Sequence, residues 1–173
     1  MVIWLNGTFG VGKTTTAALL AERLPGARVF DPEWVGYMLQ ANVKDQEYSD
    51  FQQLEPWRTL VPVVVAEIAR WSGQDVVAPQ SVLVEEYWAE LAAGFAAQGL
   101  DVVHVVLDAD RSTLEARIRA DEVERQAEPW RLDHIGRYET ARPWLHATAD
   151  VVVPTDRRSP EEVAAAVLAR VAV

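Results

Sequence analysis

The chain has 173 residues, of which 50% are apolar and 24% are charged. This length and composition fit a single domain, residues 1–173, with a substantial core, and they exclude a disordered or fibrous chain. The 16 basic and 26 acidic side chains give a net charge of −10, which argues against a general nucleic-acid binder, because such proteins rely on Lys and Arg to neutralise phosphates. An anionic ligand therefore requires a local positive site.

The absence of Cys excludes disulfides and thiolate zinc sites, and the three His residues lack metal-binding spacing. No apolar run approaches the ~20 residues that span a bilayer, and the N-terminus lacks the basic region of a secretion signal. We therefore expect a soluble, cytoplasmic protein, monomeric or homodimeric, without a membrane segment. Its expected partners are small molecules and not nucleic acids.

Short apolar runs alternate with stretches of helical spacing along the chain. The runs predict strands buried on both faces, at Val2–Leu5, Ala27–Phe30, Val76–Ala78, Val102–Leu107 and Val151–Val153. Between them, apolar residues recur at helical spacing, and Ser159-Pro160-Glu161-Glu162 is a strong helix start before Val163–Val171. Alternation of strands and helices predicts an α/β fold with a parallel sheet covered by helices on both faces.

The strongest motif follows the first predicted strand and opens the first predicted helix. Gly7-Thr8-Phe9-Gly10-Val11-Gly12-Lys13-Thr14 matches the phosphate-loop pattern G-x-x-x-x-G-K-[ST]. Such a loop needs Gly because its backbone N–H groups must converge on a polyphosphate, while Lys13 bridges the outer phosphates and the Thr14 hydroxyl binds Mg²⁺. A Gly-rich turn with an incidental Lys is the plain alternative. The glycine order excludes a dinucleotide-binding loop.

This motif predicts ATP and Mg²⁺ as ligands. The residues expected to bind the nucleotide are Thr8, Phe9, Gly10, Val11, Gly12, Lys13, Thr14 and Thr15 and, from outside the loop, Thr155, with Thr14 also on the metal. The third predicted strand ends in Pro79 and offers no acidic residue at that end, so no second protein ligand for Mg²⁺ is predicted.

Two segments are too long or too charged for plain strand–helix alternation. Residues 32–74 contain Pro32, Pro56 and Pro62, whereas residues 111–142 hold seven of the fourteen Arg residues among seven acids. Insertions at the loop ends of a parallel sheet commonly handle ligands. Arg and Glu at helical spacing are also typical of a solvated helix face.

Several of these residues together resemble the tunicamycin resistance protein family. The resemblance rests on the phosphate loop and on more specific features: Asp31-Pro32-Glu33 with Gly36, Trp57-Arg58, Pro79, Leu114-x-x-Arg117-x-Arg119, and Trp130 with Ile135 and Arg137. It implies a three-layer phosphate-loop kinase fold, with a five-stranded parallel sheet in the order 2-3-1-4-5. It also implies a substrate-side helical segment at about 32–74 and a mobile helical lid at about 118–138. Longer members continue into a basic, aromatic tail that this chain lacks, so we expect no membrane role.

Asp31 follows the second predicted strand, so its carboxylate should emerge at the edge of the sheet that also presents the phosphate loop. In the kinases that this chain resembles, that position faces the acceptor hydroxyl, where Asp31 would take the proton or hold a Mg²⁺-bound water. The alternative is a helix cap, with Asp31 as N-cap before Pro32. Glu33 is a weaker candidate for the same role.

The resemblance also assigns roles to arginines and to the substrate segment. It implies that Arg117 packs on the adenine ring and that Arg137 reaches the transferring phosphate, with Arg125 and Arg131 as weaker lid candidates and Arg119 beside them. For the acceptor we expect contacts from Asp31, Glu33, Trp34, Trp57, Arg58 and Gln80, with Ser81 as a neighbour. Trp residues are more often core than ligand platform, and His104 is expected to be a satisfied interior His.

The sequence thus favours a small-molecule kinase that transfers phosphate from ATP to a hydroxyl of a nucleoside-like or antibiotic acceptor. Lys13, Asp31, Arg117 and Arg137 are its expected catalytic residues, because positioning and charge neutralisation dominate this chemistry. An ATP-dependent protein that sequesters a toxic compound without transfer is the alternative. A mechanical ATPase is disfavoured, because the chain is short and offers no obvious arm.

Overall fold

The computed structural model describes residues 1–123 and 125–171, which form a three-layer α/β fold around one parallel sheet. The strands are β1 (Val2–Asn6), β2 (Ala27–Val29), β3 (Asp75–Pro79), β4 (Val102–Asp108) and β5 (Val151–Pro154). Their order is β2-β3-β1-β4-β5, and each pair is parallel. The predicted strands and their predicted order are confirmed.

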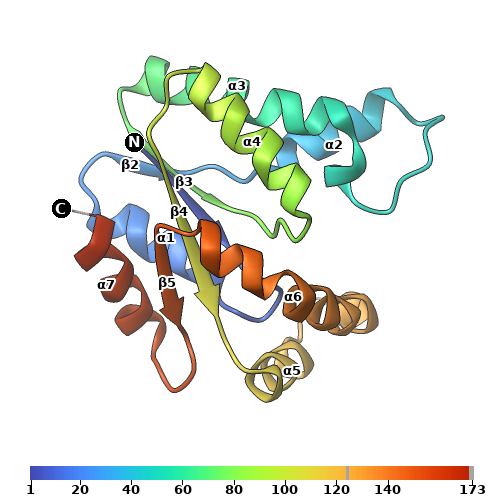
Figure 1. The fold of residues 1–173 in the computed structure, drawn as a ribbon, viewed down its shortest axis with the longest axis vertical. Helices are drawn as coiled ribbons and strands as arrows, with labels where there is room; N and C mark the ends of the chain where they lie inside the picture. Colours follow the sequence, from blue (N-terminus) through green and yellow to red (C-terminus); the bar gives the residue numbers. More distant parts are fainter. Residues whose placement is uncertain (124, 172–173) are drawn as a thin grey trace.

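Helices cover both faces of this sheet (Figure 1). They are α1 (Lys13–Arg23), α2 (Glu33–Asn42), α3 (Glu55–Ser72), α4 (Glu85–Ala97), α5 (Arg111–Ala120), α6 (Glu128–Thr148) and α7 (Pro160–Val171), with short 3₁₀ turns η1 (Phe51–Gln53) and η2 (Arg125–Ala127). Helices α3 and α4 lie together on one side of the sheet, and α1 and α7 lie together on the other. None of the helices in the described part of the chain is long and apolar enough to cross a membrane.

Alternate side chains of the central strand enter two different cores. Ile3 and Leu5 pack with α1 and α7, whereas Val2 and Trp4 pack with α3 and α4. Trp4 lies against Trp88 of α4, with ring centroids 5.8 Å apart. Because every residue of β1 is buried, the strand is fixed on both faces and delivers the next residues, the phosphate loop, at a defined point.

The expected burial of all five strands on both faces is wrong for β2. This strand is only three residues long and lies at the edge of the sheet, with Arg28 and Val29 exposed to solvent. An apolar run predicts a strand but does not tell an edge position from a central one. The capping prediction for α7 is confirmed, because the Ser159 hydroxyl accepts a hydrogen bond from the Glu162 N–H and Glu162 accepts one from the Ser159 N–H.

The charge-rich segment 111–142 packs more closely on the core than its composition suggests. Leu114 and Ile118 of α5 and Ile135 and Tyr138 of α6 are 2% exposed or less. Buried Asp108 at the end of β4 accepts hydrogen bonds from Tyr138 and Arg142 of α6. The premise that this segment has little core to pack on is therefore wrong for much of α5 and α6.

Candidate functional site

The phosphate loop leaves β1 at Gly7 and enters α1 at Gly12, and its conformation explains its glycines. Gly7, Gly10 and Gly12 all have positive φ angles, of 134°, 77° and 97°. A Cβ on Gly7 would lie 2.6 Å from the Leu107 carbonyl oxygen, so a side chain is excluded there by space as well as by conformation. The loop thus wraps the N-terminus of α1, where free N–H groups and the helix dipole favour a bound anion.

Lys13 supplies the positive charge of this loop. Its Nζ donates a hydrogen bond to the Thr8 carbonyl at 2.9 Å and lies 5.4 Å from the centre of the Phe9 ring. Partial burial lowers the pKa of Lys13 to about 7, the charge of Arg131 adds to this effect, and the negative charge of Glu33 opposes it. A polyphosphate bound here would restore the charged form of the amine.

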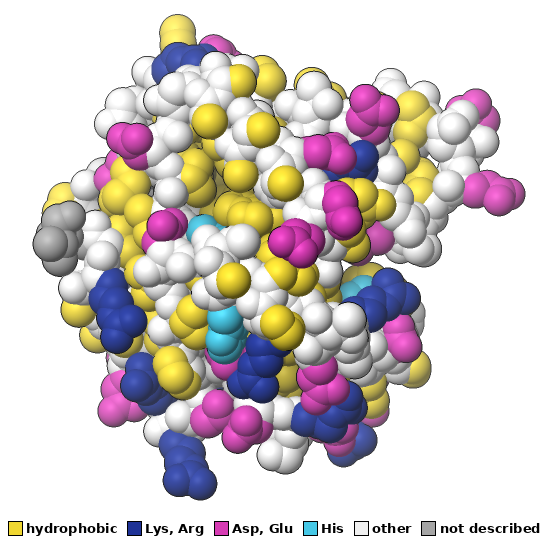
Figure 2. All heavy atoms as spheres, viewed as in Figure 1, with side chains coloured by type: hydrophobic (Ala, Val, Ile, Leu, Met, Phe, Trp, Pro, Cys, Tyr) yellow, Lys and Arg dark blue, Asp and Glu magenta, His cyan; other side chains and the backbone are white. Residues whose placement is uncertain are grey.

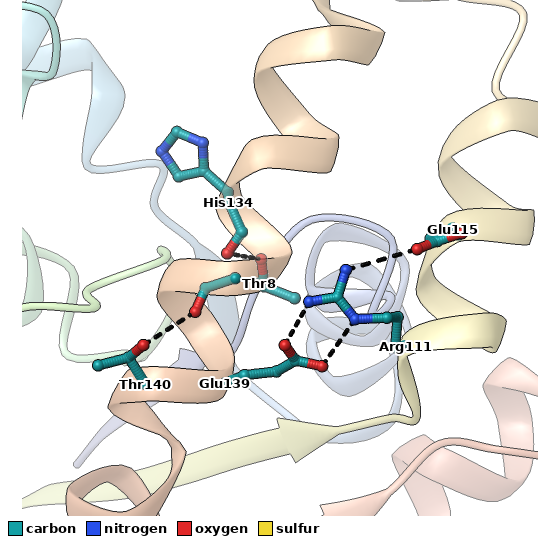
Figure 3. Close-up of polar contacts among 7 residues, drawn as sticks. Thr8, Arg111, Glu115, His134, Glu139 and Thr140 are labelled. Atoms are coloured by element: carbon teal, nitrogen blue, oxygen red, sulfur yellow. Dashed lines mark hydrogen bonds and ion pairs between the residues drawn. The ribbon is translucent and has the colours of Figure 1, made fainter.

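Aromatic side chains from α6 close over the other side of the loop. The Phe9 ring lies 4.8 Å from Trp130 and 5.3 Å from His134, and the Arg131 guanidinium lies 5.6 Å from the Phe9 ring centre. Figure 3 shows Thr8 beneath α6, where its hydroxyl meets the His134 carbonyl at 3.5 Å. Sequence reasoning gave His134 no role, because only its three-dimensional neighbours distinguish it from the other His residues.

Arg117 and Thr155 lie together at the far side of the loop, as the sequence prediction requires. Arg117 donates to the Thr155 hydroxyl at 3.0 Å, to the Thr155 carbonyl at 2.9 Å and to the Gly10 carbonyl at 3.3 Å. Both side chains line the cleft described below. A guanidinium plane held in this way forms a wall against which a planar base can stack.

Two carboxylates stand at the opposite end, where β2 leads into α2. Oδ1 of Asp31 accepts the Glu33 N–H at 2.9 Å, as the predicted cap would, although Pro32 occupies the N-cap position of α2 and Asp31 is the residue before it. Within the described part of the chain, its second oxygen makes no hydrogen bond. Burial and the negative charge of Asp31 raise the pKa of Glu33, whose Oε2 accepts a hydrogen bond from Tyr37.

One continuous cleft of about 1390 Å³ joins the phosphate loop to these carboxylates. In Figure 2 a notch separates the part of the molecule built on α2, α3 and α4 from the part built on α5 and α6. The predicted residues on its wall are Phe9, Gly10, Val11, Gly12, Lys13, Thr14, Thr15, Asp31, Glu33, Gln80, Ser81, Arg117, Arg131, Arg137 and Thr155. This volume exceeds that of an ordinary pocket for one small ligand and has room for two substrates.

Several other predicted residues do not line this cleft. Thr8 is fully buried, and Arg125 and Arg119 are exposed and ion-paired with Glu122 and Glu115, respectively.

Arg137 lies on the cleft wall, but its side chain is 58% exposed and ion-paired with Asp133. Arg131, expected to be a weaker candidate, lies near the phosphate loop. Its positive charge therefore lowers the pKa of Lys13.

The acceptor contacts expected from Trp34, Trp57 and Arg58 need correction. Trp57 is fully buried, and its indole N–H donates to the Pro32 carbonyl, so it anchors the start of α2. Trp34 is 69% exposed and is not among the residues that line the cleft. Arg58 donates to Glu90 and to the Gln52 carbonyl, and its guanidinium lies 4.3 Å from the Tyr87 ring centre. Trp57 and Arg58 therefore support the cleft from behind, and none of the three side chains forms its surface.

A residue that the sequence analysis missed joins the phosphate loop to the segment that follows β3. Asn6, the last residue of β1, is fully buried and accepts hydrogen bonds from the N–H groups of Gly7 and Val82 at 2.8 and 2.9 Å. Its amide nitrogen donates to the Val82 carbonyl and contacts His104, which is itself buried as expected, with a pKa lowered to about 4 by burial. A buried Asn directly before a phosphate loop was the available signal.

The residues around the loop fit a Mg²⁺ ion that binds mainly through phosphate oxygens. Thr14 presents a hydroxyl at the N-terminus of α1, and Asp31 lies on the same cleft wall. No cluster of three or more acidic, His or Cys residues suited to a metal occurs in residues 1–123 and 125–171. A bound Mg²⁺ usually keeps several waters and takes few protein ligands, of which the Thr14 hydroxyl would be one.

The parallel sheet, its strand order and the phosphate loop define a phosphate-loop protein with a kinase-like α/β fold. A family model described as an AAA domain matches residues 2–137, more than half of the chain, and the chain belongs to that family. It is also similar to the tunicamycin resistance protein of Deinococcus radiodurans, with a TM-score of 0.80 and 29% identity over 99% of this chain and 95% of that one. The resemblance predicted from the sequence is thereby confirmed.

More distant solved structures are small-molecule kinases. A sugar kinase from Janibacter sp. matches with a TM-score of 0.75 and 18% identity, over 99% of this chain and 94% of that one. A gluconokinase from Sinorhizobium meliloti matches with a TM-score of 0.69 and 17% identity, over 99% of this chain and 90% of that one. These likenesses show the fold. The comparison with curated proteins gave no match.

Proposed function

We propose that this protein is an ATP- and Mg²⁺-dependent phosphotransferase that phosphorylates a hydroxyl group of a small molecule. The observation that supports this most is the single cleft that has the phosphate loop at one end and Asp31 with Glu33 at the other. Binding of ATP alone would not require a second polar end. A kinase requires both ends, because the acceptor hydroxyl must meet the terminal phosphate in line.

Different residues along this cleft have different roles in the proposed reaction. Lys13 and the loop N–H groups hold the phosphates, and Arg117 with Thr155 forms the wall for the base. Asp31, fixed at the start of α2 through one oxygen, keeps its other oxygen for the acceptor hydroxyl. Arg131 and Arg137 on the opposite wall would offset the charge on the transferring group. Bound Mg²⁺ would neutralise phosphate charge and orient the phosphate oxygens.

The names of the similar proteins support a proposal for the acceptor class. The Deinococcus protein is named for resistance to tunicamycin, and the other neighbours are named for sugars and gluconate. We therefore propose a nucleoside-like or antibiotic acceptor for this chain. The alternative, an ATP-dependent protein that only sequesters such a compound, is favoured by the lack of an acidic residue at the end of β3, where the chain reads Pro79-Gln80-Ser81.

The test is a screen of acceptor-dependent ATP consumption over nucleosides, tunicamycin and aminoglycoside-like antibiotics. We expect at least one compound to stimulate ATP turnover by the wild-type protein and not by the Lys13→Ala variant. A compound that binds in the presence of ATP but never stimulates turnover would favour sequestration. Failure of the entire panel to bind or to stimulate turnover would contradict the proposed acceptor class.

A further inference from the structure

Gln80 is a buried amide on the cleft wall whose hydrogen-bonding groups are unused. It is the first residue after β3, and its backbone N–H donates to the Leu5 carbonyl at 3.0 Å, which fixes it beside β1. Its side chain is 9% exposed and lines the cleft. Within residues 1–123 and 125–171 neither the oxygen nor the nitrogen of that amide has a hydrogen-bond partner. The buried side-chain atoms without a partner in the described residues are Trp4 Nε1 and Ser81 Oγ, so the Gln80 amide instead reaches the open cleft, where a ligand can meet it.

The other buried amides near the cleft show the usual behaviour. Both atoms of the Asn6 amide are engaged, with Gly7, Val82 and His104. The amide nitrogen of Gln52, which is 7% exposed, donates to the Ser81 carbonyl at 2.6 Å and to Asp50 at 3.3 Å. The fold therefore engages both atoms of the Asn6 amide and the nitrogen of the Gln52 amide. It leaves Gln80, immediately beside them, open toward the cleft.

Aromatic side chains form the walls on the same side of the cleft. Phe51 lines it and packs on the backbone of α2 at Gly36, where a Cβ would lie 2.3 Å from the Phe51 ring. Tyr87 also lines it and is backed by the Arg58 guanidinium, which in turn donates to the Gln52 carbonyl. Gln52 is hydrogen-bonded to Ser81, the residue after Gln80, so these rings lie in the same part of the cleft as Gln80.

We propose that Gln80 recognises the acceptor through a hydrogen-bond donor and acceptor that lie side by side on a planar ring. A primary amide offers an acceptor oxygen and a donor nitrogen in one plane, which complements the edge of a nucleobase. The aromatic walls suit a flat ring and suit a simple polyol less well. This inference rests on the proposed function, and it narrows the acceptor to compounds with a nucleobase-like edge, whose hydroxyl then lies toward Asp31.

The experiment measures binding directly, by calorimetry with a nonhydrolysable ATP analogue present, so that it does not depend on phosphoryl transfer. The probes are uridine and adenosine, each with a methylated analogue that blocks its ring-edge N–H donors, and ribose, which has no ring edge. We expect at least one nucleoside to bind and its methylated analogue and ribose to bind ~10-fold or more weakly, the scale of one lost hydrogen bond to a buried group.

Two variants separate recognition from structure. Gln80→Met keeps the size of the side chain and removes the amide, so we expect that nucleoside to bind ~10- to 100-fold more weakly and the preference over the methylated analogue to vanish. Affinity for the ATP analogue should not change, and the unfolding temperature should stay the same, because the amide that is removed bonds to no described residue. Gln40→Met is the matched control, since Gln40 also lines the cleft but is exposed.

The inference is overturned if Gln80→Met binds the nucleoside as tightly as wild type, if it lowers the unfolding temperature, or if ribose binds as well as the nucleosides. Failure of both nucleosides to bind would also overturn it. That outcome leaves the proposed function to the ATP-consumption screen, where a non-planar acceptor could still be phosphorylated. The two proposals can therefore fail separately.

Discussion

Lys13 couples nucleotide binding to pH. Burial lowers the pKa of its amine to about 7, and a bound phosphate would raise that pKa again. The free protein therefore loses a proton above pH 7 that binding must restore. We expect affinity for a nonhydrolysable ATP analogue to fall as the pH rises from about 7 to 9, by at most ~tenfold per pH unit, and proton uptake to accompany binding in that range. Calorimetry in buffers of different ionisation enthalpy measures both.

The controls for this prediction are two lysine variants. Lys13→Ala should lose most of the affinity at pH 7 and all of its pH dependence, without a lower unfolding temperature. Lys44→Ala, at the other lysine, which is exposed, should behave as wild type. An affinity for the ATP analogue that does not change between about pH 7 and 9 would show that Lys13 stays charged in the free protein.

Asp31 combines a helix cap with a position at the acceptor end, and an amide separates the two roles. Asn caps helices about as well as Asp, so Asp31→Asn should keep the unfolding temperature and the ATP affinity. Phosphoryl transfer should fall by ~10²-fold or more, the scale of losing a general base. Single-turnover transfer to an acceptor found in the screen measures this.

Asp50 provides the matched control for Asp31. It caps η1 in the same way, with Oδ1 accepting the Gln52 N–H at 3.0 Å, and it lines the same cleft. Asp50→Asn should leave transfer within a few-fold of wild type. Equal losses in both variants would indicate a general effect of charge in the cleft, and an unaffected Asp31→Asn would pass the role to Glu33.

At the scale of elements, one buried carboxylate fixes α6 to the sheet. Asp108 is 7% exposed, and it accepts hydrogen bonds from Tyr138 and Arg142 and lies 3.2 Å from His146. Asp108→Ala leaves these groups without their partner, which should cost about 2–4 kcal/mol and lower the unfolding temperature by roughly 5–15 °C. Asp110→Ala, at an exposed neighbouring residue, should change the unfolding temperature little. Similar decreases in the Asp108→Ala and Asp110→Ala variants would refute the anchoring role of Asp108.

The lid prediction can be restricted to the connection between α5 and the buried part of α6. Figure 3 shows Arg111 of α5 joined to Glu139 of α6, and these helices are buried at Leu114, Ile118 and Ile135. We propose that residues 119–123 and 125–131 close over bound ATP and that residues 135–148 stay in place. Hydrogen exchange should slow at 119–123 and 125–131 on adding an ATP analogue and change little at 135–148. Equal exchange with and without the analogue would argue against a lid.

Helix α6 shows that a charge-rich composition can conceal a buried face. Ile135, Tyr138 and Leu145 are spaced for one buried face of α6, but the many Arg and acidic residues around them favoured the prediction of a solvated segment. The start of α7 was predictable, because its capping box is local and rests on Ser159 and Glu162. Local chemistry could thus be predicted from sequence, whereas burial set by distant neighbours could not.

At the scale of the whole molecule, the sheet order and the phosphate loop were predictable, and the acceptor end of the cleft was only partly so. Asp31 and Gln80 follow strands that end at the same edge of the sheet, and parallel strands place such residues together. Trp57 and Arg58, which were also expected at the acceptor end, act behind its surface. Their roles depend on contacts with Pro32, Gln52 and Tyr87, which no spacing pattern encodes.

The cleft also explains how an acidic protein can hold an anionic substrate. Its net charge is −10, yet Lys13, Arg117 and Arg131 lie on the cleft wall around the phosphate loop. Figure 2 shows basic side chains gathered over the part of the molecule that contains α5 and α6. The positive field is therefore local, as the composition required, and it lies opposite the two carboxylates of the acceptor end.

The central claim is that this cleft moves a phosphoryl group from ATP to an acceptor hydroxyl. It is tested most directly by incubating the protein with ATP, Mg²⁺ and an acceptor that binds, then weighing the acceptor by mass spectrometry. The account predicts that the acceptor gains the mass of one HPO₃ group, with one ADP formed for each product molecule and none with Lys13→Ala. An acceptor that stays bound and unmodified while ATP is intact or merely hydrolysed would contradict it.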